Sequence, residues 1–265
     1  LFEDHYALSL TSPVWRTICR HSWLHQVVVR GLLRSLRPVH GWILVRDLVT
    51  ENCLVDFIQR GHRQFVLLGA GFDSTAIRNP SWLSGVQVIE VDHPSTQSVK
   101  LARIKNLNAD VTQHFEAVAV DFEQQRLTDG LADSSYASNQ PALFAWQGVI
   151  YYLTATAIKE TLNDIATLTA PGSELLFDFL LPENAIAAKE RRVMSLARLF
   201  TARMGERYVS FHSPEQITTL LEEAGFEIIN LMLDEDLQAA HFSDRRDDLK
   251  AMRGFGIVHA RRVAA

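Results

Sequence analysis

An apolar segment that ends in a pair of glycines constrains this chain more than any other feature. Residues 65–68 are Phe-Val-Leu-Leu, and Gly69, Ala70 and Gly71 follow them directly. Glycine adopts positive φ and has no Cβ, so a strand that breaks into Gly-x-Gly can turn sharply and bring backbone N–H groups close to a ligand. Ser74 stands where a dinucleotide-binding Gly-x-Gly-x-x-Gly has its third glycine. The pattern predicts a nucleotide-binding loop after a buried strand, with an incomplete NAD fingerprint.

Strand-like and helix-like segments alternate after residue 60. Apolar runs typical of strands lie at 64–68, 86–91, 115–120, 142–147, 173–180, 226–233 and 254–260, and helical patterns lie at 94–107, 154–169, 184–204 and 214–224. This alternation predicts βαβ units and a mostly parallel α/β sheet. The last two strands, joined by a short connection, are expected to form an antiparallel hairpin at one sheet edge. That edge suits a class I methyltransferase better than a dinucleotide-binding fold.

The 265 residues are expected to form a single domain with four parts. Residues 1–60 would be a helical N-terminal cap, 61–181 the ligand-binding core, 182–212 a lid insertion, and 213–265 a C-terminal helix and strands. Ser213, followed by Pro214 and by Gln216 at the third helical position, predicts a capping box that begins a helix at residue 214.

Composition excludes several classes of partner. A hydrophobic content of 47% and a charged content of 22% are ordinary for a globular protein, and a net charge of −5 argues against a nucleic-acid partner. Residues 141–158 are nearly uncharged, but Pro141 and Gln147 interrupt them, so we expect a buried strand entering a helix and no membrane partner. Cys19 and Cys53 form neither a disulfide framework nor a metal-ligand cluster. We therefore expect a reducing, cytoplasmic location and no metal.

Two carboxylates follow successive predicted strands. Asp92 comes after the second strand, 21 residues beyond Gly71, and Asp121 comes after the third, directly before Phe122. Ligands of such sheets bind at the carboxyl ends of the strands. A carboxylate can accept hydrogen bonds from both hydroxyls of a ribose, and an acid beside an aromatic ring can bind and cover an adenine. The pair predicts an adenosine pocket; the alternative is that each acid only caps a helix or a turn.

Four motifs, in order and at fitting spacing, resemble the leucine carboxyl methyltransferase family. They are residues 64–74, residues 90–94 with Lys100, residues 120–122 and residues 146–154. The resemblance covers about residues 46–180. It implies a class I, Rossmann-like methyltransferase sheet and S-adenosyl-L-methionine as the cofactor.

The resemblance also implies which residues bind this cofactor. Gly69 and Gly71 would line its methionine end, Asp92 would hold the ribose, and Asp121 with the backbone of Phe122 would meet the adenine. Arg46 lies 23 residues before Gly69, where the family has an arginine near the cofactor or the substrate carboxylate. Gln147 would also contact the cofactor, although the family usually has Glu at this position; Gln can hydrogen-bond but cannot pair with a positive charge.

Candidates for substrate binding come from the same comparison and from chain position. Tyr152 matches a tyrosine that the family keeps beside the transfer site, and Tyr151 is its neighbour. Arg203 belongs to the basic face of the predicted lid, which is either a solvated surface or a binding site for an acidic substrate or carrier protein. His212 precedes the capped helix, where the chain often faces the substrate.

These residues predict an O-methyltransferase that forms a methyl ester on a small organic acid, either free or bound to a carrier. A carboxylic acid with a pKa of about 4 is ionised at neutral pH and needs no general base, only a group such as Arg46 or Tyr152 to orient it. A hydroxyl acceptor would need a base, for which His212 is the candidate. A protein C-terminal carboxylate is a further alternative. An NAD-dependent oxidoreductase and a non-catalytic cofactor-binding protein are alternatives of other classes.

Overall fold

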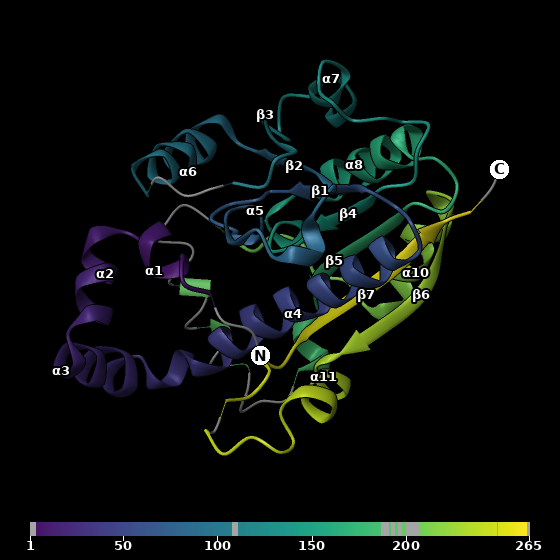
Figure 1. Ribbon diagram of the computed structural model, residues 1–265. Helices are drawn as coiled ribbons and strands as arrows, with labels where there is room; N and C mark the ends of the chain where they lie inside the picture. Colours follow the sequence, from purple (N-terminus) through teal and green to yellow (C-terminus); the bar gives the residue numbers. More distant parts are fainter. Residues whose placement is uncertain are drawn as a thin grey trace.

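A seven-stranded sheet forms the centre of the computed structural model, which describes residues 4–107, 111–186, 191, 194–195, 198–199, 207–247 and 249–263 (Figure 1). The strands are β1 (Gln64–Leu68), β2 (Gln87–Asp92), β3 (Phe115–Ala119), β4 (Leu143–Trp146), β5 (Glu174–Leu180), β6 (Phe226–Leu233) and β7 (Phe255–Arg262). Their order across the sheet is β3-β2-β1-β4-β5-β7-β6.

The direction of the strands confirms the predicted fold class. β1 pairs in parallel with β2 and β4, β2 with β3, and β4 with β5, whereas β7 is antiparallel to both β5 and β6. The sheet is therefore mostly parallel with an antiparallel edge, as expected. The carboxyl ends of β1, β2 and β4 meet at one edge of the sheet, which is where a ligand of this fold binds.

The expected short hairpin between the last two strands is wrong in one respect. Residues 234–254 separate β6 from β7, and they contain helix α11 (Asp234–His241). Three acidic residues in the first turn of α11 favour a helix start there, and the Asp236 carboxylate accepts a hydrogen bond from the Leu233 N–H at 2.9 Å. The acidic run 234–236 was the available sign of this helix.

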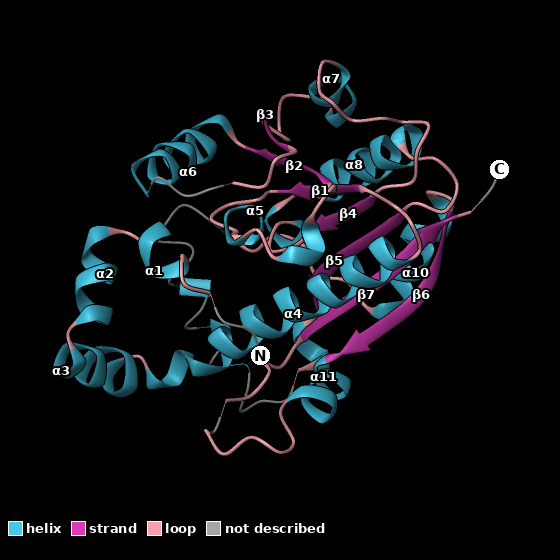
Figure 2. Ribbon diagram, viewed as in Figure 1, coloured by secondary structure: helices cyan, strands magenta, loops and turns pink. Residues whose placement is uncertain are grey.

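Helices cover both faces of the sheet (Figure 2). The longer ones are α4 (Arg37–Gln59), α6 (Pro94–Leu107), α8 (Ala155–Leu168) and α10 (Pro214–Glu223); the shorter ones near the sheet are α1 (Ala7–Leu10), α5 (Thr75–Arg78), α7 (Leu127–Ala132), η3 (Ser81–Leu83), η4 (Ile150–Tyr152) and η5 (Glu183–Ala185). Alternate residues of β1 pack on opposite faces: Phe65 belongs to a cluster with Phe57 of α4, and Val66 to a cluster with Leu162 of α8.

The predicted capping box is confirmed at the start of α10. The Ser213 N–H donates to Gln216 Oε1 at 2.8 Å, and the Gln216 N–H donates to Ser213 Oγ at 3.3 Å. Both side chains therefore satisfy backbone donors that a helix start leaves without partners, and α10 begins at Pro214 as expected.

Two further segments remain, the helices that precede α4 and the predicted lid. Before α4, the chain forms α2 (Pro13–Arg20), α3 (Ser22–Leu24), the π-helix η1 (His25–Leu32) and η2 (Arg34–Leu36), which extend away from the sheet in Figure 1. Part of the predicted lid, including Arg203, lies outside the described residues. Within the described part of the chain, no helix is long and apolar enough to cross a membrane.

Close packing around α4 generates a stability prediction. Gly41 is buried in α4, and a Cβ there would overlap the carbonyl oxygen of Lys250, which is backbone and cannot rotate away. A Cβ at Gly31 would lie at an ordinary 3.5 Å from the Gln26 carbonyl oxygen. We expect Gly41→Ala to lower the free energy of unfolding by about 2 kcal/mol. The matched Gly31→Ala should be neutral or stabilising by up to about 1 kcal/mol. Urea denaturation measures both, and equal effects would show that α4 packs differently.

Candidate functional site

The glycine turn has the geometry that its sequence predicts. Gly69 and Gly71 follow β1 with φ of 67° and 50°, in the left-handed region that residues with a side chain rarely adopt. A Cβ on Gly69 would also overlap the side chain of Val149. The loop is fixed to the neighbouring strand, because the Gly69 N–H donates to the Val91 carbonyl at 2.8 Å. The N–H groups of Gly69, Ala70 and Gly71 all donate within the protein, so the loop offers a ligand a surface without side chains at the two glycines rather than free N–H donors.

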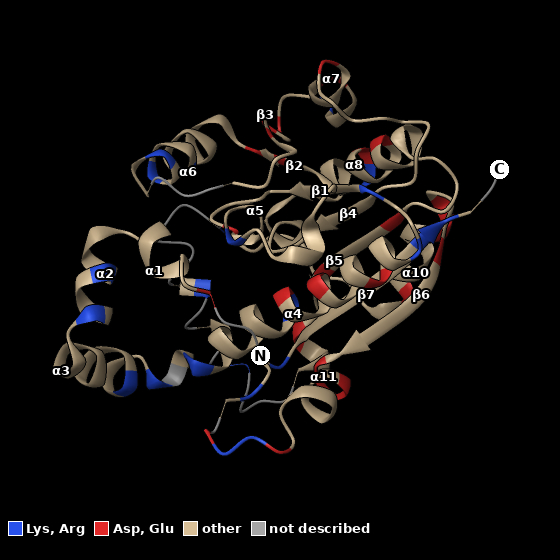
Figure 3. Ribbon diagram, in the orientation of Figure 1, with Lys and Arg blue, Asp and Glu red and all other residues tan. Residues whose placement is uncertain are grey.

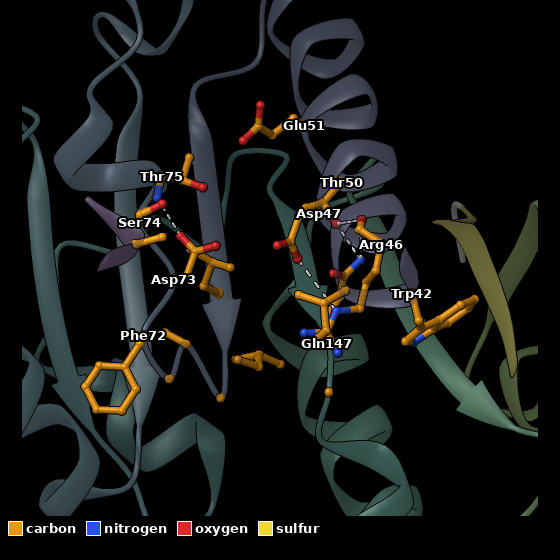
Figure 4. Close-up of a pocket in the computed structure, with 18 of the residues that line it drawn as sticks. Trp42, Arg46, Asp47, Thr50, Glu51, Phe72, Asp73, Ser74, Thr75 and Gln147 are labelled. Carbon is orange, nitrogen blue, oxygen red and sulfur yellow. Dashed lines mark hydrogen bonds and ion pairs between the residues drawn. The ribbon is translucent and has the colours of Figure 1, made fainter. Parts of the chain in front are cut away.

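A cavity of about 590 Å³ lies beside this turn, a volume typical of small-molecule sites. Its wall combines α1, α4, the end of β1 with the glycine loop, the segment after β4, and the start of β7. The residues that the argument below uses are Trp42, Arg46, Asp47, Thr50, Glu51, Gly69, Gly71, Asp73, Gln147, Tyr151, Tyr152, Tyr208 and Phe255. In Figure 4, Trp42 and Arg46 lie across the cavity from Phe72 and Asp73.

A buried ion pair organises the α4 side of the cavity. Arg46 Nη1 lies 3.4 Å from Oδ2 of Asp178, a fully buried carboxylate of β5. The same Asp178 accepts hydrogen bonds from Trp42 Nε1 at 3.2 Å and from the Gly148 N–H at 2.6 Å. Burial opposes the charge of Arg46, but the attractions of Asp178, Tyr151 and Asp47 together outweigh it and raise the pKa of the guanidinium. Arg46 is therefore a cation, and Asp178, which is not part of the cavity wall, balances much of its charge.

Arg46 keeps limited access to the cavity. Its side chain lines the cavity and is 17% exposed. Nε is buried beyond the reach of solvent and makes no hydrogen bond within the described ranges, and Oδ1 of Asp47 is 3.7 Å away. Nη1 reaches the Tyr151 hydroxyl only at 3.5 Å. A cation that lines the cavity suits an oxygen acceptor on a bound molecule.

Aromatic rings form the wall next to Arg46. The centroid of Tyr151 lies 4.8 Å from that of Tyr152, 5.2 Å from that of Tyr208 and 5.9 Å from that of Phe255. Burial raises the pKa of the Tyr151 hydroxyl further above its usual range, so it remains a neutral phenol. These rings exclude water and present hydroxyl groups to whatever occupies this end of the cavity.

The rim of the cavity between α4 and the glycine loop is acidic. Asp47 and Glu51 of α4 face Asp73 of the glycine loop, and Glu51 is paired with Arg78. Burial, together with the nearby charges of Asp73 and Glu51, raises the pKa of Asp47 to about 6 although Arg46 opposes the shift. Such a rim attracts a positively charged ligand, which would relieve the repulsion among the carboxylates.

Gln147 joins the segment after β4 to the middle of α4 by hydrogen bonds. Its amide nitrogen donates to Thr50 Oγ1 and, at 3.3 Å, to the Arg46 carbonyl oxygen. Thr50 in turn donates to the Arg46 carbonyl at 3.0 Å. An ionised Glu could not donate to a carbonyl, so the amide fits this position better than the residue usual in the family.

The two adenosine-binding candidates lie at the predicted strand ends but outside the cavity wall. The Asp92 carboxylate ends β2 and accepts hydrogen bonds from the Gly71 N–H and, at 2.6 Å, from the His93 N–H. Burial raises its pKa although these two bonds oppose the shift. Asp121 follows β3, accepts from the Glu123 N–H at 3.0 Å, and lies 3.7 Å from His93 Nε2. Each carboxylate therefore accepts backbone hydrogen bonds where the chain turns. Each also lies at the carboxyl end of a strand, where ligands of this fold bind.

The structure brings some of the remaining predicted residues together and leaves others apart. Tyr152 lines the cavity with Tyr151, and Phe122 packs against the main core beside Asp121. His212 does not line the cavity; its backbone N–H donates to the Leu180 carbonyl at 2.8 Å. Arg203 lies outside the described residues.

Sequence reasoning missed Asp178, Thr50, Asp47 and Tyr208. Asp178 had a usable signal, because it is the only charged residue in the apolar run 175–180. Thr50 had none, since its role depends on where Gln147 lies in space.

Comparison with known proteins decides which family this arrangement represents. Residues 1–166 match the family model described as leucine carboxyl methyltransferase. The chain belongs to this family. YktD of Bacillus subtilis, named as a candidate S-adenosyl-L-methionine-dependent methyltransferase, is 32% identical over 219 residues, covering 82% of the chain and 71% of YktD. A protein of Mycobacterium tuberculosis with the same kind of name is 35% identical over 193 residues, covering 72% of the chain and 63% of that protein.

Solved structures share the fold of this leucine carboxyl methyltransferase family member. A DUF574-family protein of Streptomyces avermitilis superimposes with a TM-score of 0.64 at 13% identity, covering 88% of each chain. An O-methyltransferase family protein of Burkholderia thailandensis gives a TM-score of 0.55 at 13% identity, covering 94% of this chain and 62% of the other. The suspected family, the class I fold, the activity as a methyltransferase and the cofactor S-adenosyl-L-methionine are thereby confirmed.

The buried ion pair generates a second stability prediction. Asp178→Asn keeps the size of the side chain and an acceptor for Gly148, but it leaves the charge of Arg46 uncompensated. We expect the free energy of unfolding to fall by about 3 kcal/mol. The control is Lys159→Gln, which breaks an exposed 2.8 Å pair with Glu223 and should cost less than about 1 kcal/mol. If urea denaturation gives equal losses, the Arg46–Asp178 pair does not hold this wall.

Proposed function

We propose that this methyltransferase transfers the methyl group of S-adenosyl-L-methionine to a carboxylate oxygen of a small organic acid and forms a methyl ester. The observation that carries the proposal is the cavity, which Arg46 and three tyrosines line together with the glycine loop. The donors suit a carboxylate, and no histidine is among the described residues that line the cavity.

The residues present fit the cofactor. Gly69 and Gly71 leave a surface without side chains at the end of β1, and Asp92 lies next to them with a hydrogen bond to Gly71. The acidic rim of Asp47 and Asp73 suits the positive charges of a sulfonium and an amino group. When bound, the cofactor supplies an activated methyl group on a sulfonium sulfur.

The chain's own residues would then position the acceptor. Methyl transfer needs the acceptor oxygen, the methyl carbon and the sulfur in line, so alignment and exclusion of water supply most of the catalysis. Arg46 would hydrogen-bond the acceptor carboxylate while Asp178 fixes the guanidinium plane. Tyr151, Tyr152 and Tyr208 would exclude water from the acceptor. No proton has to be removed, because the acid is already ionised.

The hydroxyl acceptor is the second candidate, since one residue in the cavity could serve as its base. The pKa of Asp47 is raised to about 6, which brings this carboxylate closer to the range that suits a general base near neutral pH. Asp47 is a better base candidate than His212, because it lines the cavity. A protein C-terminal carboxylate would use the same groups as a small acid.

Cofactor binding depends on Asp92 in this proposal. Asp92→Asn removes the charge but keeps an oxygen that can accept from Gly71. We expect the affinity for S-adenosylhomocysteine, measured by isothermal titration calorimetry, to fall about 10- to 100-fold, the value of a hydrogen bond to a charged group. Glu160→Gln, an exposed acid on α8, is the control and should bind as the unmodified protein does. Unchanged affinity of Asp92→Asn would show that the ribose binds elsewhere.

Turnover distinguishes the acceptor classes. Release of S-adenosylhomocysteine is measured with a panel of carboxylic acids, phenols and peptides with free C-termini, between about pH 6 and pH 9. We expect turnover with small acids at a nearly constant rate over this range, because their pKa of about 4 lies below it. Asp47→Asn and His212→Gln should each retain turnover within about tenfold, whereas loss of a general base costs about 10²- to 10⁴-fold.

Two outcomes would contradict this part of the proposal. Turnover of phenols alone, lost in Asp47→Asn, would assign the hydroxyl reaction. Binding of the cofactor without turnover of any acceptor would favour the non-catalytic alternative.

A further inference from the structure

The helices between α1 and α4 pack against the rest of the protein less closely than other parts of the chain do. We call residues 12–36, which contain α2, α3, η1 and η2, the N-terminal arm. No side chain described in the arm is buried, although it contains eleven Val, Leu, Ile and Trp residues between Val14 and Leu36. The arm extends away from the sheet in Figures 1 and 2. Amphipathic helices normally bury their apolar side chains, so the exposed ones in the arm lack a packing partner among the described residues.

Large apolar side chains of the arm are exposed. Val14, Trp23, Val27 and Leu32 are between 53% and 75% exposed. Trp23 and Val27 are four residues apart in continuous helix and therefore lie close together on its surface. Single exposed apolar residues are common, but four within 25 residues point to a contact surface.

The charge of the arm differs from that of the rest of the protein. It contains Arg16, Arg20, Arg30 and Arg34 and no acidic residue; indeed no Asp or Glu occurs from His5 to Arg46. The whole chain carries −5 and the arm +4, so the remainder carries −9. Figure 3 shows this segregation, with basic residues but no acidic ones coloured on the arm. Arg20, Arg30 and Arg34 form no ion pair with any residue that the structure describes.

We propose that the N-terminal arm binds the surface of an anionic lipid bilayer. Exposed Val and Leu side chains would enter the boundary between headgroups and acyl chains, Trp23 would lie at the headgroup level, and the arginines would pair with lipid phosphates. A bilayer with negative headgroups is the surface that satisfies the apolar and the basic side chains together. The sulfonium chemistry of the cavity is not needed for this binding, so the proposal stands apart from the proposed function.

A symmetric contact between the arms of two copies fits less well, because it would bring eight arginines together without any acid of either arm to neutralise them. An arm packed on the acidic remainder of a second copy is an outcome that the test below distinguishes. The expectation of no membrane partner concerned a membrane span at residues 141–158, whereas the arm would bind at the bilayer surface.

Vesicle flotation of the full chain tests the proposal. We expect the protein to float with phosphatidylglycerol vesicles and not with phosphatidylcholine vesicles, and to be released when salt is raised from about 0.1 M to about 1 M. The combined variant Arg20→Gln, Arg30→Gln and Arg34→Gln should bind about 100-fold more weakly, since each arginine near an anionic surface contributes about a fivefold factor. Trp23→Ser with Val27→Ser should also weaken binding at least tenfold.

Two control variants test whether vesicle binding depends on the arm or on exposed charge and apolar surface elsewhere in the protein. Lys159→Gln removes an exposed positive charge from α8, and Ile229→Ser removes an exposed apolar side chain from β6; both should bind vesicles as the unmodified chain does. All substitutions are at exposed positions, and thermal unfolding checks that each variant is folded.

Three results would overturn the proposal. The first is an absence of flotation with phosphatidylglycerol vesicles. The second is equal loss of binding in the arm variants and in the controls. The third is a dimer of the unmodified protein, seen by light scattering, that does not bind vesicles and that the arm variants abolish. This result would assign the arm to binding a second copy of the chain.

Discussion

The ion pair between Arg46 and Asp178 is the interaction on which the cavity depends. It joins α4 to β5, and Asp178 also receives hydrogen bonds from Trp42 and from the backbone of Gly148 after β4. One buried carboxylate thus fixes three separate parts of the chain at the carboxyl end of the sheet. A charged pair in such a place is rarely justified by stability alone, because desolvation offsets much of the attraction. Its value here is position: it holds a cation and an aromatic wall opposite the glycine loop.

This constraint divides the site into two halves of different chemistry. The half beside the glycine loop has Asp73 and suits a cationic cofactor; Asp47 and Glu51 add negative charge from α4, where Asp47 Oδ1 lies 3.7 Å from Arg46 Nε. The half beside Arg46 has the guanidinium and three tyrosines and suits an anionic acceptor. A methyl sulfonium and a carboxylate bound in these halves would attract each other across the cavity, in the direction that the transfer requires.

Periodicity and local motifs predicted most of the fold. The strand at 64–68 and the helices at 94–107 and 214–224 were found within one residue of their observed bounds, because each has strong patterning or a capping signal. Helix α11 was missed because its start depends on Asp234–Asp236 capping rather than on apolar spacing. In the site, Gly69 and Gly71 were predicted by their motif, and Arg46 by the resemblance to the family. Asp178 and Thr50 were not, since their roles arise only when α4 lies against β4 and β5, a contact between distant parts of the sequence.

A crystal structure of the chain with S-adenosylhomocysteine tests the central claim most directly. The account predicts the ribose hydroxyls at hydrogen-bond distance from the Asp92 carboxylate, with the sulfur beside Gly69 and facing the cavity wall that contains Arg46 and Tyr151. A nucleoside bound away from Asp92, or a sulfur that faces away from this cavity, would contradict it.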